Sequence, residues 1–295
     1  APSGSDSLGL ALLAALLLLP LLCMGDDRAL RRFFWAVLLF LLAVQLYAAA
    51  ARIWPTRVYP PFFLRLVRKP VVTGALLTLC GGGLLLLRRG DGGRSARWKR
   101  PYRIALLLMA AAGICALVLV NTVLKDRSFG VFDRFLKLNE RWGTDRGKIW
   151  SYCLSLYGDF TPLQKLFGGG PGCLYALDTA HPLFSDAVLY SAHNEYLHYL
   201  LTVGAFGLAA YLGLLVFAAR AALRHRKRNP ASVGFLLGTV CYGAQALVSI
   251  AQPVSTPFLF LMIALCVGSG RCYSATAHLS TSPMGAQMAS LARES

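Results

Sequence analysis

Long apolar segments dominate this sequence and restrict the folds that it can adopt. Most are long enough to cross a hydrocarbon core of roughly 30 Å as helices, and lipid offers no partner to an unpaired backbone N–H or C=O group. The first run is interpreted as a true span rather than a signal peptide, because no basic segment precedes it and further runs follow. The sequence therefore predicts an all-α polytopic membrane protein with about seven transmembrane helices, at 8–24, 33–51, 71–87, 104–124, 196–219, 233–250 and 257–268.

Basic residues mark two of the segments between the predicted spans. The segment 88–103 carries seven Lys or Arg residues against one Asp, and the segment 220–228 carries five. Such loops are expected on the cytoplasmic side of the membrane. The chain between them then contains one large extracytoplasmic loop before the last three spans. The predicted parts are four transmembrane helices within 1–124, the loop at 125–195, three helices within 196–270 and a disordered cytoplasmic tail at 271–295.

The net charge of +17 at first suggests a nucleic-acid partner. The basic loops account for this excess, so membrane lipids are expected as partners and nucleic acid is not. One group of cations departs from the pattern, because Arg52, Arg68 and Lys69 follow the second run, where alternation places the chain outside. Either the topology differs near the start of the chain, or these cations serve an anionic group at the outer surface.

Cysteine, glycine and histidine patterns argue against metal and nucleotide sites. No CxxC pair appears, and a disulfide between Cys153 and Cys173 in the predicted loop is left open. The stretch FGGGPG (167–172) lacks the Lys-Ser/Thr of a phosphate loop, so it is interpreted as a turn. His193 and His198 do not have the four-residue spacing of a helical zinc pair. No metal or other cofactor is therefore expected.

The stretch SAHNEYLHYLL (191–201) places His193 and Asn194 where a predicted span meets the outer aqueous face. An imidazole with an ordinary pKa near ~6.5 suits proton transfer at neutral pH. The alternative is that His193 is a polar helix cap at the membrane interface.

A helix is predicted over 141–159, with apolar residues such as Ile149, Cys153 and Leu154 forming one buried stripe. Arg146 in this segment can offer a forked guanidinium to a pair of phosphate oxygens, and Arg141 lies shortly before it. The alternative for each is a solvated cation. Together with His193, these arginines indicate an anionic, lipid-attached substrate that needs a proton moved.

The order of these motifs resembles the O-antigen ligase/polymerase superfamily. The matching pieces are Arg-x-x-x-Trp at 146–150, the Gly-Pro-Gly turn at 167–172, and His-Asn-x-Tyr-Leu opening a span with Gly-x-x-Gly at 193–212. The resemblance covers about 71–268 and includes the large external loop before the last three spans. Family members usually have more upstream spans, so the resemblance implies an N-terminally incomplete or shortened member.

The resemblance implies transfer of a glycan from an undecaprenyl-pyrophosphate carrier to an acceptor glycan or lipid, outside the bacterial cytoplasmic membrane. His193 would be the catalytic histidine and Arg146 the loop arginine, with Arg141, Asn194, Arg68, Lys69 and Arg52 as substrate-binding candidates. The family arginine before a Gly-Ala pair is missing here, where Thr73 precedes Gly74. Arg68, Lys69 or Arg52 would then take its place. The competing hypotheses are a transporter or flippase of lipid-linked glycans, which the nearly charge-free spans disfavour, and a non-catalytic membrane scaffold.

Overall fold

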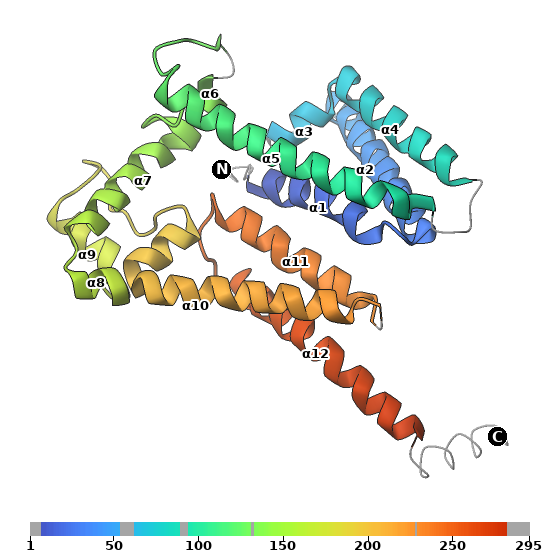
Figure 1. Cartoon of the computed structure of the whole chain (residues 1–295). Helices are drawn as coiled ribbons and strands as arrows, with labels where there is room; N and C mark the ends of the chain where they lie inside the picture. Colours follow the sequence, from blue (N-terminus) through green and yellow to red (C-terminus); the bar gives the residue numbers. More distant parts are fainter. Residues whose placement is uncertain (1–6, 54–61, 89–93, 131–132, 228, 282–295) are drawn as a thin grey trace. The chain divides into compact units, whose positions relative to one another are not determined.

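The computed structural model describes residues 7–53, 62–88, 94–130, 133–227 and 229–281. Helices and turns make up this part of the chain, and no strand occurs in it. The prediction of an all-α protein is therefore confirmed for the described residues. The chain divides into two compact units, Ala1–Gly143 and Thr144–Ser295, and each is described by itself (Figure 1).

Unit 1 is built on a pair of long helices, α2 and α4, that pack along each other. Its core includes Leu41, Val44 and Cys80 from this pair. Gln45 in α2 donates from Nε2 to Thr73 Oγ1 in α4 at 2.8 Å, so this polar side chain joins two apolar helices. The elements are α1 (Ser7–Cys23), α2 (Asp27–Ile53), α3 (Phe62–Val67), α4 (Pro70–Arg88), the 3-10 helix η1 (Arg94–Trp98), α5 (Lys99–Thr122) and α6 (Asp133–Leu136).

Unit 2 joins a group of short helices to three long ones. The long helices α10, α11 and α12 all pack against one another, and α8 and α9 contact α10. A compact core forms around Cys153 of α7, Leu174 of α9 and Leu201 of α10. The elements are α7 (Trp142–Asp159), α8 (Pro162–Phe167), α9 (Cys173–Ala180), α10 (Glu195–His225), α11 (Ala231–Ala246) and α12 (Thr256–Thr281).

Each of the seven predicted apolar runs corresponds to a helix of the structure, although the runs 8–24, 104–124 and 233–250 extend past the ends of α1, α5 and α11. Four helices within the described residues are long and apolar enough to cross a membrane: Asp27–Ile53, Pro70–Arg88, Arg94–Thr122 and Glu195–His225. The other three apolar helices are shorter, at Ser7–Cys23, Ala231–Ala246 and Thr256–Ser269. Large side chains on the long helices face outward, such as Leu39, Leu85 and Leu107. Such helices identify a membrane protein, while the number seven stays a prediction.

The segment predicted as a large loop, 125–195, contains the helices α6 to α9. The helix predicted over 141–159 is confirmed as α7. Its buried stripe includes Ile149 and Cys153, but the prediction was wrong for Leu154, which is 55% exposed. At 100° per residue, the position after Cys153 turns away from that stripe. The helix α12 continues to Thr281, into the segment predicted as a disordered tail, and 282–295 lie outside the described residues.

Candidate active site

Helix α7 carries Arg146 close to its N-terminal end. The preceding Gly143, Thr144 and Asp145 have φ values of 62°, 64° and 62°, a left-handed conformation that is uncommon for residues with a Cβ. Beyond this turn, Ile149 is buried in the core of unit 2. Burial of this stripe holds the half-buried Arg146 at the edge of the core.

The segment between α9 and α10 is fastened to α7 by three hydrogen bonds. Lys148 Nζ donates to Leu183 O at 3.2 Å, and Tyr152 Oη donates to His181 O at 2.7 Å. Trp150 Nε1 donates to Ala192 O at 3.0 Å, directly before His193.

A buried carboxylate in α9 completes this attachment. Asp178 is 1% exposed and accepts hydrogen bonds from the backbone N–H groups of Leu183 at 2.9 Å and Leu189 at 2.8 Å. A buried carboxylate needs such donors to be tolerated in the core. The backbone that leads to His193 is therefore held at several points, as a preorganised site requires.

His193 occupies the junction where this segment enters α10. Its φ is 49°, and its backbone N–H donates to Ser191 Oγ at 3.3 Å. The next residue, Asn194, is the N-cap of α10, and its Oδ1 accepts from the backbone N–H of Leu197 at 3.1 Å. Asn194 therefore has a capping role in the structure, and its predicted role in substrate binding stays a prediction.

The structure brings His193 and Arg146 together. Burial lowers the pKa of His193, and the positive charge of the neighbouring Arg146 lowers this pKa further. Both effects disfavour the imidazolium form. The site therefore combines a neutral imidazole, able to accept a proton at neutral pH, with a fixed positive charge beside it.

The sequence also raised the questions of a metal site and of a disulfide between Cys153 and Cys173. Among the described residues, no group of three or more His, Cys, Asp and Glu side chains is placed to hold a metal ion. Cys153 and Cys173 are both buried free thiols in the core of unit 2. Burial is the main reason that the pKa of Cys153 rises to about 12, so this thiol is unreactive as a nucleophile.

A buried carboxyl group that the sequence interpretation did not select lies directly after the N-cap. Glu195 is 2% exposed, and its two oxygens accept hydrogen bonds from Tyr211 Oη and Tyr242 Oη, each at 3.0 Å. Tyr242 Oη also lies 3.0 Å from Thr256 Oγ1. This network joins α10, α11 and α12 at the end that carries His193. In the sequence, this network could have been suspected from an acidic residue at the start of a predicted span and from tyrosines within apolar segments.

The glycine-rich turn packs against a kink in α10. Gly204 has φ 70° and ψ −171°, which interrupts the helix and leaves carbonyl groups in the preceding turn without helical donors. Gly169 N donates to Leu201 O at 2.8 Å, and Gly170 N donates to Thr202 O at 3.0 Å. The FGGGPG stretch is thus a turn, and its backbone N–H groups donate to the carbonyl groups that the break in α10 leaves without helical donors. This agrees with its interpretation as a turn rather than a phosphate loop.

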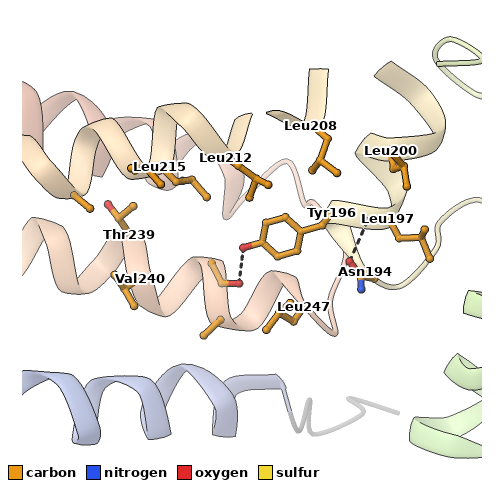
Figure 2. Close-up of a pocket in the computed structure, with 14 residues that line it drawn as sticks. Asn194, Tyr196, Leu197, Leu200, Leu208, Leu212, Leu215, Thr239, Val240 and Leu247 are labelled. Atoms are coloured by element: carbon orange, nitrogen blue, oxygen red, sulfur yellow. Dashed lines mark hydrogen bonds between the residues drawn. The ribbon is translucent and has the colours of Figure 1, made fainter. Parts of the chain in front are cut away.

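An open groove of about 720 Å³ runs between α10 and α11 within unit 2 (Figure 2). Asn194 lies at one end, and Tyr196 reaches across to α11, where its hydroxyl donates to Gly243 O at 2.7 Å. Apolar side chains line the rest, among them Leu200, Leu212, Leu215, Val240 and Leu247. The groove is therefore suited to an apolar chain whose polar end lies near Asn194 and the adjacent His193.

The remaining predicted site residues belong to unit 1. Arg52 is exposed at the end of α2, while Arg68 is half-buried and Lys69 exposed just before α4. The hydrogen bond between Gln45 and Thr73 shows that these ends of α2 and α4 are adjacent. Their cations therefore gather at one end of the helix pair. Arg141 is exposed immediately before α7. The roles of these four cations in substrate binding stay predictions.

A comparison with protein families supplies an independent finding. The model of the O-antigen ligase family matches residues 72–212, which include Arg146, the glycine-rich turn, His193 and the kink at Gly204. No curated protein and no solved structure matches the chain. Residues 72–212 are therefore similar to the O-antigen ligase family, and this match supports the O-antigen ligase/polymerase superfamily to which the order of the motifs pointed.

Proposed function

We propose that this protein transfers a glycan from undecaprenyl pyrophosphate to an acceptor hydroxyl at the outer face of the bacterial cytoplasmic membrane. The family points to glycan transfer in the synthesis of surface polysaccharide. The observation that carries the proposal is the pairing of a neutral His193 with the cationic Arg146. The lipid-linked donor, the acceptor and the side of the membrane are parts of the proposal.

The chemistry assigns a separate task to each member of the pair. His193 accepts the proton of the acceptor hydroxyl while that oxygen forms a bond to the anomeric carbon of the donor sugar. The bond between this carbon and the pyrophosphate oxygen breaks, and the electron pair leaves with the pyrophosphate. Arg146 stabilises the negative charge that develops on this leaving group. Arg141, Arg52, Arg68 and Lys69 are further candidates for binding the same anion.

The groove between α10 and α11 supports a donor with a long apolar tail. It is lined almost entirely by apolar side chains, and its polar end at Asn194 adjoins His193 in the sequence. A prenyl chain in the groove would bury apolar surface while its pyrophosphate stays near the histidine.

The test compares lipid-linked and finished surface glycans in cells that carry wild-type protein or His193→Ala. We expect the variant to lose transfer by at least about 100-fold, the usual minimum effect of removing a general base. Accumulation of single lipid-linked repeat units would identify a polymerase. Accumulation of long chains on the carrier, with a bare acceptor, would identify a ligase.

His181→Ala is the matched control, because His181 lies on the same segment with an exposed side chain, and its hydrogen bonds to Tyr152 and Leu177 come from its backbone. This control should retain the wild-type profile. If His193→Ala also retains it while the protein is inserted at normal levels, the catalytic role of His193 is wrong. A transporter or a non-catalytic scaffold would then be the better interpretation.

A further inference from the structure

A cluster of arginines at one end of unit 1 has no role in the proposed reaction. It includes Arg28 and Arg32 from the first turns of α2, and Arg94, Arg97, Arg100 and Arg103 from η1 and the start of α5. All six side chains are exposed. None of them forms an ion pair with an acidic side chain among the residues that the structure describes. Their positive charge is therefore available to a partner.

The fold brings these two sets of arginines together through a buried carboxylate. Asp27, which is 5% exposed, accepts hydrogen bonds from the backbone N–H groups of Arg94 and Ser95, each at 3.0 Å. Its Oδ1 also accepts a hydrogen bond from Ser95 Oγ, and Gly25 N donates to the same hydroxyl at 3.1 Å. Asp27 is thereby used internally, and η1 is fixed beside the first turn of α2.

The position of the cluster indicates what it meets. Its arginines lie where two candidate membrane spans begin, Asp27–Ile53 and Arg94–Thr122, the position at which lipid headgroups are expected. Trp98 is 55% exposed among them, with the guanidinium carbon of Arg97 5.7 Å from its ring centroid. Tryptophan is enriched at this depth of a membrane, and guanidinium groups bind phosphate oxygens in pairs.

We propose that Asp27 and Ser95 assemble these arginines into a binding site for anionic phospholipid headgroups. The site belongs to unit 1, whereas His193 and Arg146 belong to unit 2, and the inference is independent of the proposed glycan transfer. A phosphodiester would bind between guanidinium groups from α2 and η1, while Trp98 lies against the upper part of the acyl chains.

The experiment measures quenching of tryptophan fluorescence by brominated lipids, with the full chain reconstituted in vesicles. Dibrominated phosphatidylglycerol is compared with dibrominated phosphatidylcholine, and the signal of Trp98 is the difference between wild type and Trp98→Phe. Each arginine near an anionic surface contributes on the order of a fivefold preference. We expect the wild type to prefer phosphatidylglycerol, and Arg94→Gln/Arg97→Gln, which loses two of these arginines, to lower that preference by about 25-fold.

Two further variants separate an assembled site from simple surface charge. Asp27→Asn makes the chain more positive, so surface charge alone predicts stronger binding of phosphatidylglycerol, whereas an assembled site predicts weaker binding. Ser95→Ala leaves the charge unchanged and should also weaken binding. A wild-type preference that is unchanged or stronger in these variants, with the helical content retained, would overturn the proposal.

The cations at the other end of α2 supply the control. The variant Arg52→Gln/Arg68→Gln/Lys69→Gln removes three positive charges, one more than Arg94→Gln/Arg97→Gln does. These three residues are separated from η1 by most of the 27-residue helix α2. Quenching of Trp98 should be the same as in wild type. Addition of inorganic phosphate at a concentration matching the lipid should not reduce the preference. If it does, the cluster binds free phosphate rather than lipid, and the proposal is wrong.

Discussion

His193 is held in a backbone conformation that few residues with a Cβ adopt, with φ at 49°. Histidine is among the residue types that enter this region more often than most. The energetic cost of such a conformation persists only where the surroundings determine it, and here Trp150 and Asn194 fix the backbone on either side. The residue that the sequence selected for chemistry is therefore also a residue that the fold constrains.

The neighbourhood of Arg146 predicts how His193 responds to pH. Burial and Arg146 both lower its pKa, so the imidazole should stay neutral, and reactive toward diethyl pyrocarbonate, at a pH below its ordinary pKa of about 6.5. Arg146→Gln should move the midpoint of this reaction to higher pH, and Arg146→Lys should move it less. The rate attributable to His193 is obtained by subtracting that of His193→Gln. Equal midpoints in wild type and Arg146→Gln would contradict the interaction.

The same lowered pKa links His193 to stability. The unfolded chain binds this proton more readily than the folded protein, so folding stability falls as the pH falls. The contribution of His193 is fully present above about pH 6.5, its ordinary pKa, and is lost progressively as the pH drops toward the lower pKa of the folded state.

Helix α10 consists of two segments joined by a kink at Gly204. The first, 195–203, carries the residues next to His193, and the second contains Tyr211, whose hydroxyl reaches back to Glu195. The kink at Gly204 packs closely against the chain around Gly168. A Cβ atom on Gly204 would lie only 2.4 Å from Leu166 O. This close approach leaves no space for a side chain at Gly204.

A substitution in this helix tests the contact. Gly204→Ala should lower the free energy of unfolding by about 2 kcal/mol or more, because alanine is strained at positive φ and its methyl group has no room. Gly213→Ala is the control within α10, since nothing lies within 4 Å of a Cβ at Gly213. It should be neutral or stabilising by up to about 1 kcal/mol. Thermal unfolding in detergent measures the melting temperatures of the two variants. Equal values for Gly204→Ala and Gly213→Ala would show that the kink accommodates a side chain at Gly204 without strain.

The lengths of the apolar helices do not by themselves fix how many of them cross the membrane. The helix α11 has 16 residues, or about 24 Å at 1.5 Å per residue, which is short for a hydrocarbon core of roughly 30 Å. The basic segments 88–103 and 220–228 nevertheless predict two cytoplasmic loops, one around the start of α5 and one around the end of α10.

Labelling of single introduced cysteines with an impermeant maleimide tests this arrangement. The variants Ala187→Cys and Ala251→Cys should react in intact cells, because seven spans place both residues outside. Ala96→Cys and Lys227→Cys should react only after permeabilisation. These four residues are exposed in the structure, and the unmodified protein supplies the background from its native cysteines. Protection of Ala251→Cys alone would show that α11 does not cross the membrane.

Apolar runs of this length were enough to predict a helical membrane protein, because in lipid a helix satisfies every backbone N–H and C=O group within its own segment. His193 and Arg146 could also be selected from the sequence as candidates, since reactive groups are conspicuous among apolar residues, and their catalytic roles stay predictions. Local patterns carry no information on which distant groups meet. The folded protein places Arg146 beside His193, pairs Glu195 with Tyr211 and Tyr242, and packs the glycine-rich turn against the break in α10. These contacts join residues far apart in the chain, and packing rather than periodicity decides them.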